Sequence, residues 1–226
     1  LVWTRENDLQ NGWFRQASVM QLRAGIDTEG KVTAWDATRA GGDLSPHTLA
    51  GILPGELPRT PKPVNDLILS ATESLYDGWL IDSGGVEGLV SDYDFPNKKL
   101  RHISVNHGLP LAAWRAVGHS FTAFAKETLM DELAEMAGLN GFEFRRRNLQ
   151  NNPRLLGALE AVEQGLEQWE IPAGHHIGIS THGSFRSFVA QAAEVSIEGN
   201  KIRVHRVLCA IDCGAVINPD IVRAQI

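Results

Sequence analysis

The feature that most constrains the fold is a long hydrophobic alternation in the last third of the chain. Apolar residues recur mostly at every second position around a turn at residues 198–200, namely Phe188, Ala190, Ala192, Val195 and Ile197 before it and Ile202, Val204, Val207, Cys209 and Ile211 after it. Successive side chains of a strand point to opposite faces, so this spacing is typical of strands with one buried face. We expect a long β-hairpin here.

A second alternation lies near the start of the chain. Its apolar side chains are separated by small or polar ones and occupy Met20, Leu22, Ala24 and Ile26. Residues 27–30 have the composition of a turn, and residues 31–35 suit a returning strand. Residues 19–35 therefore predict another hairpin.

The middle of the chain carries a helical pattern. Apolar side chains recur there at spacings of three and four residues, at Phe121, Phe124, Ala125, Leu129, Leu133 and Met136. Such a stripe is one face of a helix, with Ser120 suited to the N-cap and Gly138 to the C-terminal end. Shorter helices are expected at residues 141–149, at 154–168 and after Asn218, which would be an N-cap followed by proline.

Residues 41–101 interrupt the regular pattern. Paired glycines and spaced prolines mark loops, so we expect a long irregular segment with short helical or extended pieces. The order β, irregular, α, β predicts an α+β fold in which β-hairpins pack with a central helix. Residues 1–110 would hold the first hairpin and the irregular segment, and residues 111–226 the helix and the long hairpin. These are parts of one region rather than independent domains.

Charge and composition exclude several classes of protein. The net charge is -6, from 21 Lys and Arg against 27 Asp and Glu, so no basic field for nucleic acid is expected. The basic run Arg145–Arg147 closes a helical segment, where cations suit the helix dipole. Cys209 and Cys213 share one strand face but lie too far apart to form a disulfide. The histidines lack the spacing of metal ligands, and there is no glycine-rich phosphate motif.

Two loops combine a flexible backbone with hydrogen-bond donors. The first is Trp114–Ser120, where an arginine and a glycine precede a helix start. Backbone N–H groups at a helix start attract anions, and an arginine fork binds phosphate or oxo groups. The second is Thr181–Phe185, a small polar loop before the long hairpin. Two alternatives remain open: an ordinary loop-to-helix junction for the first loop, and a hydrolase using His182 and Ser184 for the second.

Three blocks of the sequence, in order along the chain, carry a resemblance to a known family. The first block consists of WTREND at 3–8, Arg15 and LRAG at 22–25. The second consists of LAAWRAVGHS at 111–120 and EFRR at 143–146. The third covers residues 178–225 and includes CAIDCG at 209–214 and NPD at 218–220. These blocks resemble the large, molybdopterin-binding subunit of molybdenum hydroxylases, the xanthine oxidase family. The second block is most similar to the membrane-associated aldehyde dehydrogenase group and to the isoquinoline 1-oxidoreductase beta subunit.

The resemblance implies a piece of the molybdopterin-binding domain and an oxidoreductase activity. Such enzymes hydroxylate N-heteroaromatic compounds or oxidise aldehydes, with water as the oxygen source. The implied cofactor is molybdopterin with molybdenum, in its cytosine dinucleotide form. Electrons would pass to 2Fe–2S clusters on a small partner subunit, with a cytochrome c as a candidate acceptor. The implied location is the bacterial periplasm or membrane surface, or else the cytoplasm.

The resemblance also assigns site residues. It places Arg115, Ala116, Val117, Gly118 and His119 beside the molybdenum centre, and His182, Gly183 and Ser184 at another wall of the pocket. No protein side chain in this chain is expected to ligate the metal. The family's glycine-rich loop would precede residue 1 and its general-base Glu would follow residue 226. We therefore expect a fragment without a catalytic residue, inactive alone. A non-catalytic scaffold without cofactor is the alternative.

Overall fold

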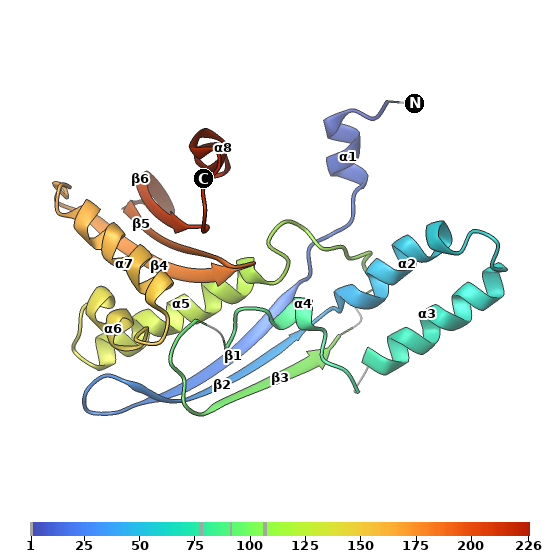
Figure 1. Cartoon of the computed structure of the whole chain (residues 1–226), viewed down its shortest axis with the longest axis horizontal. Helices are drawn as coiled ribbons and strands as arrows, with labels where there is room; N and C mark the ends of the chain where they lie inside the picture. Colours follow the sequence, from blue (N-terminus) through green and yellow to red (C-terminus); the bar gives the residue numbers. More distant parts are fainter. Residues whose placement is uncertain (1, 77–78, 91, 106–107) are drawn as a thin grey trace. The chain divides into compact units, whose positions relative to one another are not determined.

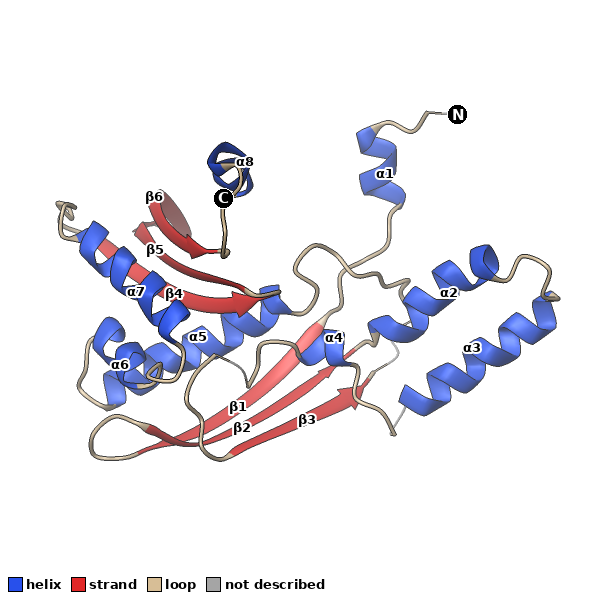
Figure 2. Cartoon of the chain, in the orientation of Figure 1, coloured by secondary structure: helices blue, strands red, loops and turns tan. Residues whose placement is uncertain are grey.

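The computed structural model describes residues 2–76, 79–90, 92–105 and 108–226. It confirms the α+β class, with helices and two three-stranded sheets along the described chain (Figures 1 and 2). The chain forms two compact units. Unit 1 comprises residues Leu1–Gln21, Ala37–Glu87 and Leu100–Phe121, and unit 2 comprises Leu22–Asp36, Gly88–Lys99 and Thr122–Ile226. Each unit is described separately below.

The first sheet has the order β1-β2-β3, and each of its strands contributes residues to both units. The strands are β1 (Ser18–Ile26), β2 (Val32–Gly41) and β3 (Lys98–Ser104). The predicted hairpin of residues 19–35 is confirmed as β1 and β2. Asp27 closes its turn, because its carboxylate accepts hydrogen bonds from the backbone N–H groups of Glu29 and Lys31.

Unit 1 is more helical than the prolines and glycines of residues 41–101 predict. It contains α1 (Arg5–Asn11), α2 (Leu44–Glu56), α3 (Lys62–Tyr76) and α4 (Ser83–Val86). The expectation of an irregular segment is wrong for α2 and α3, which have 13 and 15 residues. Pro46 and Pro63 lie in the first turns of these helices, where a missing N–H breaks no helical hydrogen bond. A proline in that position starts a helix rather than a loop.

Unit 2 is built on the second sheet, β4 (His175–Ser184), β5 (Ser187–Glu198) and β6 (Lys201–Asp212), all antiparallel. The predicted long hairpin is confirmed as β5 and β6. Helix α7 (Pro153–Leu166) packs on these strands. Their shared core contains Ala158, Val162, Ala190 and Ala192. The small side chains of β5 let the helix approach the sheet closely.

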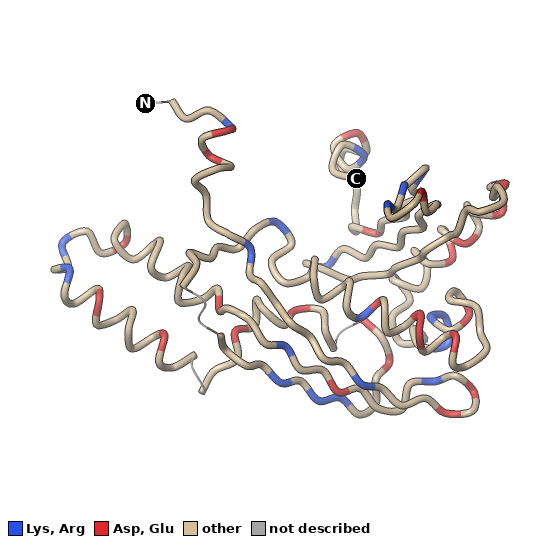
Figure 3. Tube along the Cα trace, turned by 180° about the vertical axis from the view of Figure 1, so that it is seen from behind, with Lys and Arg blue, Asp and Glu red and all other residues tan. Residues whose placement is uncertain are grey.

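The remaining helices follow the predicted positions closely. The central helix is α5 (His119–Met136), α6 spans Gly141–Arg147, and α8 spans Pro219–Gln225. Asn218 caps α8 as predicted, because its side chain accepts from the N–H groups of Asp220 and Ile221. Both signs of charge occur on several helices, whereas β3 carries only Lys and Arg and β5 only Glu (Figure 3).

Within unit 2, the turn of the first hairpin is hydrogen-bonded to Asn148, the residue that follows α6. The side chain of Asn148 accepts a hydrogen bond from the Val32 N–H at 2.8 Å and donates to the Gly30 carbonyl at 3.0 Å. Asn148 is buried, so these bonds are shielded from water. This one side chain connects segments 116 and 118 residues apart in the sequence.

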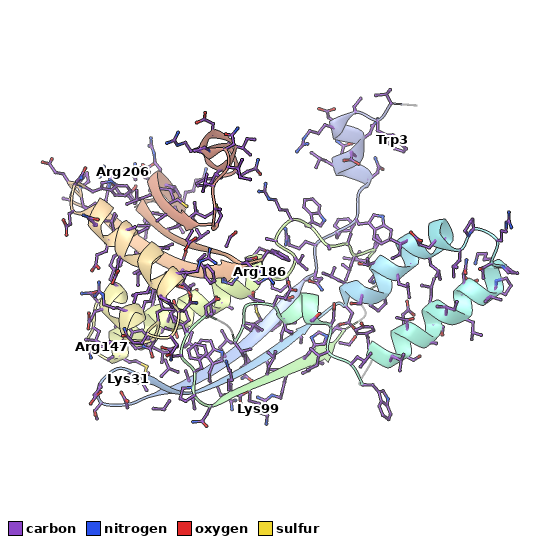
Figure 4. The ribbon with its side chains drawn as sticks, viewed as in Figure 1. Trp3, Lys31, Lys99, Arg147, Arg186 and Arg206 are labelled. Atoms are coloured by element: carbon purple, nitrogen blue, oxygen red, sulfur yellow. The ribbon has the colours of Figure 1, made fainter. Side chains whose placement is uncertain are left out.

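The segment Thr181–Phe185 is not the loop that its polarity suggests. Residues 181–184 form the end of β4, with Ser184 paired to Ser187 of β5. Only Phe185 and Arg186 form the connection, and Arg186 is labelled there in Figure 4. Both have left-handed backbones, with φ of 48° and 65°. Two-residue hairpin turns require this conformation, which Asn-Gly adopts far more readily than Phe-Arg.

The double variant Phe185→Asn with Arg186→Gly is therefore expected to be more stable than the natural sequence. Left-handed backbone costs a residue with a Cβ about 1–2 kcal/mol, so we expect a gain of about 1 kcal/mol in the free energy of unfolding. Urea unfolding followed by circular dichroism measures this difference. A lower unfolding midpoint in the double variant would contradict the assigned turn.

Candidate functional site

The segment before α5 is fixed at its start by contacts with the residues that precede β1. Phe14 and Leu111 form an isolated parallel bridge, with hydrogen bonds from Phe14 N–H to Pro110 and from Ala112 N–H to Phe14. The indole N–H of Trp114 donates to the Trp13 carbonyl at 3.0 Å. Leu111 is buried, so this junction belongs to the interior of unit 1. The following loop, residues 114–120, starts from a fixed point.

The loop itself has an uncommon backbone. Ala116 and Val117 both have positive φ, 73° and 46°, although neither is glycine. Two successive turns hold them, through hydrogen bonds from Val117 N–H to Trp114 and from His119 N–H to Ala116, both 2.8 Å. Such conformations cost about 1–3 kcal/mol each and persist where surrounding structure imposes them, commonly at ligand sites. For β-branched Val117 the conformation is a true outlier.

Gly118 is required by a close approach of two backbones within unit 1. A Cβ placed on Gly118 would lie 2.3 Å from the carbonyl oxygen of Gly84 in α4. A Cβ on Gly84 would in turn lie 3.3 Å from the Val117 side chain. Two glycines therefore let α4 and the loop touch directly, which sequence spacing could not predict.

Arg15 also holds the loop, through three hydrogen bonds. Its guanidinium donates to the carbonyl of Val117 at 2.8 Å, to the carbonyl of Arg115 at 3.0 Å and to the hydroxyl of Ser120 at 2.8 Å. The same group lies 5.9 Å from the ring centre of Trp114. Arg15 belongs to the first of the resembling blocks, but the sequence assigns it no role, because contacts across about 100 residues leave no local pattern.

The prediction that Ser120 is the N-cap of α5 is wrong. The helix begins at His119, so Ser120 lies inside its first turn, and its hydroxyl accepts from Arg15. His119 is half-buried and forms an ion pair with Glu87, with 3.4 Å between Nε2 and Oε2. Arg115 is exposed at the surface of unit 1. Residues 115–119 thus form the turn that leads into α5, and their predicted role beside a cofactor stays a prediction.

A buried polar network lies next to α4 in unit 1. Arg39 is fully buried against Gly85 and donates to the hydroxyl of Ser18 and the carbonyl of Gly42. Burial lowers the pKa of Arg39, although nearby carboxylates oppose this effect. Asp43 accepts from His102 at 2.6 Å and from Ser104, and the pKa of its carboxyl is lowered despite burial. This network fixes the end of the sheet next to α4.

Asp43 and Ser104 also line the rim of a cleft of about 270 Å³ in unit 1. Its other walls come from the α2–α3 pair and the segment before the loop, with His47, Glu73 and Leu111 among them. The lining is predominantly polar. The cleft lies wholly within unit 1, and its lining includes neither residues 115–119 nor residues 182–184.

The second predicted segment belongs to unit 2. His182 is half-buried, and its Nδ1 lies 3.2 Å from Lys126 Nζ. A lysine ammonium can only donate, so in this hydrogen bond Nδ1 accepts and Nε2 carries the ring proton. The same Nδ1 lies 3.6 Å from the Asp92 carboxylate. Lys126 is fully buried and pairs with Asp92 at 2.5 Å. Gly183 is needed here, since a Cβ would lie 2.5 Å from the Asp92 carboxylate.

A buried ion pair supports the same strand. Glu127 accepts from Arg145 Nε at 3.0 Å, from the Thr181 N–H at 2.9 Å and from the Tyr93 hydroxyl. Burial, and then the charge of Glu127, raises the pKa of Tyr93 well above its usual value, so Tyr93 is a neutral donor. The charges around Arg145 raise its pKa although burial lowers it. Arg145 is thus a core residue, not merely a cation at a helix end.

Arg154 of α7 joins the end of β6 in an ion pair with Asp212, 2.6 Å from Nη2 to Oδ1. The Arg154 hydrogen bonds, and then the Gly214 N–H, lower the pKa of Asp212 from 3.8 to about 2. Because the folded pKa lies below the unfolded one, the carboxylate stabilises the fold above pH 3.8. That contribution disappears as the pH falls through about 2.

We therefore expect Asp212→Asn to lower the urea midpoint at pH 6 and to have a much smaller effect at pH 2, where about half of the Asp212 carboxyls are already protonated. The exposed pair Asp220–Arg223 offers a matched control, and Asp220→Asn should change the midpoint little at either pH. Urea titrations at the two pH values compare the variants. An equal effect of Asp212→Asn at both pH values would contradict the explanation by the Arg154–Asp212 ion pair.

The two predicted segments therefore fall in different units. Arg115–His119 are gathered in unit 1, and His182–Ser184 are gathered at the end of β4 in unit 2. That both line one pocket stays a prediction. Cys209 and Cys213 are free and only partly buried. Among the described residues, no three His, Cys, Asp or Glu side chains gather as a metal site, and no helix has the length and hydropathy to cross a membrane.

Comparison with known proteins gives a consistent result. Residues 76–149, which include the loop, match the model of a molybdopterin cofactor-binding domain. The chain is 25% identical, over its full length, to the beta subunit of isoquinoline 1-oxidoreductase from Brevundimonas diminuta. It is also 25% identical, over 93% of its length, to a subunit of nicotinate dehydrogenase from Pseudomonas putida. It spans only 27% and 18% of the lengths of these two relatives.

A solved structure shows a similar fold. Quinoline 2-oxidoreductase from Pseudomonas putida 86 aligns with 80% of this chain and 23% of its own, at a TM-score of 0.54 and 17% identity. The likeness supports the arrangement of elements rather than any activity. The matched domain and the two relatives agree with the resemblance to the molybdenum hydroxylase family that the sequence carries.

Proposed function

We propose that this chain forms part of the cofactor site of an oxidoreductase that carries molybdenum on a molybdopterin. The observation that carries the proposal is the strained loop of residues 114–120, which lies inside the matched region 76–149. A backbone held in left-handed conformations at a helix start presents N–H donors at a fixed place. Anionic oxygen and pterin groups are the ligands that such donors recognise.

The residues proposed to hold the cofactor are Arg115, Ala116, Val117, Gly118 and His119, together with His182, Gly183 and Ser184. Arg115 would offer its guanidinium fork to anionic oxygens. The loop would offer backbone N–H groups, which are already oriented and need no rearrangement when charge develops. His182 carries its proton on Nε2 and would donate from there. The bound cofactor would supply the two-electron redox chemistry.

The substrate class proposed is an N-heteroaromatic compound or an aldehyde, with water as the oxygen source. The printed names of the two relatives, an isoquinoline oxidoreductase and a nicotinate dehydrogenase, support the heteroaromatic class. Both relatives are named as subunits, which supports a partner subunit. We propose that this partner is a small subunit with 2Fe–2S clusters, that the pterin is a cytosine dinucleotide, and that a cytochrome c accepts the electrons. The periplasm or membrane surface is the proposed location.

Metal and pterin analysis of the full-length protein tests the proposal. The protein is purified from cells that make the cofactor, and molybdenum is measured by mass spectrometry alongside fluorescent pterin oxidation products. We expect about one molybdenum and one pterin per chain, and less of both in Arg115→Ala. Protein free of both would instead support a non-catalytic scaffold. The 226-residue piece alone is expected to be inactive, and its turnover of an aldehyde or azaarene would refute that expectation.

A further inference from the structure

We propose that Arg15 is the positioning residue of the cofactor-facing loop, a role that rests on the proposed function. Its guanidinium makes three hydrogen bonds to residues 115–120, two of them to backbone carbonyls. A planar guanidinium presents its donors in a fixed fork, so bonds to two carbonyls fix the distance and the angle between them. One rigid group therefore sets the relative positions of these carbonyls.

The carbonyls that Arg15 holds determine where the loop's N–H groups point. The described peptide bonds of the chain are trans, and a trans peptide is planar with its C=O and N–H in opposite directions. Holding the Arg115 carbonyl toward Arg15 directs the Ala116 N–H to the other side of the loop. Holding the Val117 carbonyl does the same for the Gly118 N–H. Arg15 thus orients two donors without touching what they would bind.

The loop needs such a constraint because its backbone is strained. Ala116 and Val117 have φ of 73° and 46°, and neither would keep this conformation in a free chain. The loop meets the Gly84 carbonyl at Gly118 and the Arg15 guanidinium at its Val117 carbonyl. Without the guanidinium, the peptide planes at 115–116 and 117–118 would be free to rotate toward relaxed φ values. The donor directions would then be lost.

A lysine at this position should not replace the arginine. Its ammonium is a single point on a flexible chain and cannot span two carbonyls and a hydroxyl in one plane. Arg15 also adds a positive charge behind the loop, and polarised hydrogen-bond chains make the outward N–H groups stronger donors. If Arg15 positions the loop, a positive charge alone at this position should not suffice to order it. The comparison of Arg15→Ala with Arg15→Lys separates fork geometry from charge.

The test uses the full-length holoprotein with Arg15→Ala, Arg15→Lys and the control Arg59→Ala. Arg59 is an exposed arginine between α2 and α3, away from the loop in the sequence. Hydrogen exchange is followed in peptides covering residues 111–120, and the molybdenum(V) EPR spectrum is recorded. Losing bonds from a charged donor should speed exchange about tenfold or more in both Arg15 variants and not in Arg59→Ala. Both variants should also shift the EPR parameters, and methylguanidinium should restore those of Arg15→Ala.

The outcomes separate the two proposals. If wild-type protein contains molybdenum, but Arg15→Ala keeps its exchange rates and EPR spectrum, the positioning role is overturned and the proposed function stands. A full return of both readouts in Arg15→Lys would also overturn it, since charge would then suffice. If wild-type protein holds no molybdenum, the proposed function fails, and the exchange data still decide whether Arg15 orders the loop. A circular dichroism spectrum like that of the wild type shows that each variant is folded.

Discussion

Replacing Glu127 with alanine is expected to lower the free energy of unfolding by about 3–5 kcal/mol, the usual cost of removing one partner of a buried ion pair. Glu127 is 4% exposed, and Arg145 is fully buried against it. The variant would leave Arg145 with Asp131, which is half-exposed, and would leave the Thr181 N–H without its acceptor. The Tyr93 hydroxyl would keep only the Thr181 hydroxyl as a partner. Urea unfolding followed by circular dichroism measures the loss.

Glu132→Ala is the control for this prediction. Glu132 lies on the same helix but is exposed, so its replacement should change the free energy of unfolding by about 0.5 kcal/mol or less. If Glu127→Ala does not fold, Glu127→Gln keeps the shape and one acceptor and should lose less. Equal, small effects of Glu127→Ala and Glu132→Ala would mean that the pair around Arg145 contributes little.

Replacing Gly118 with alanine is expected to have the second large effect. The added methyl would lie 2.3 Å from the Gly84 carbonyl oxygen, and both atoms belong to backbones that cannot rotate away. Either α4 or the loop must move, and overpacking of this kind costs about 1–3 kcal/mol. Since the loop is the proposed cofactor-facing segment, the variant should also retain much less molybdenum. Urea unfolding and metal analysis of the full-length protein measure the two effects.

Gly55→Ala is the matched control for this substitution. Gly55 lies in α2 with open space around the position of a Cβ, so alanine should be neutral or should stabilise the helix by about 1 kcal/mol. Loss of molybdenum in Gly118→Ala with unchanged stability would place the effect at the loop itself. Unchanged stability and unchanged metal together would show that the two backbones separate freely.

Elements with a repeated local pattern were predictable from the sequence. The alternation at residues 188–211 specified β5 and β6, and the stripe from Phe121 to Met136 specified α5. The α2–α3 pair was missed because its prolines were interpreted as loop markers, although Pro46 and Pro63 stand in first turns and Pro54 lies inside α2. Strand β4 was not predicted, and its end was interpreted as a loop because polar residues such as His182 face partners in the interior of unit 2 rather than solvent.

Of the candidate site, only the local segment of residues 115–119 was predictable from the sequence. Residues 115–119 were identified from a helix start and a resemblance, and they do form one turn with an uncommon backbone. Arg15 and Gly84, which hold that turn, were not given a role. Their contacts join segments that are distant in the sequence, and such contacts depend on the whole fold rather than on local spacing.

The assembly of each unit from three separate ranges has a consequence for how the chain folds. Residues Leu22–Asp36 belong to unit 2, yet their Asn148 partner follows them by more than a hundred positions. Contacts this far apart slow folding, because a long loop must close before any of them stabilises the chain. During synthesis, the hydrogen bonds between the first hairpin and Asn148 cannot form until α6 has emerged from the ribosome. Unit 1 likewise waits for residues Leu100–Phe121, so neither unit can be completed before most of the chain has been synthesised.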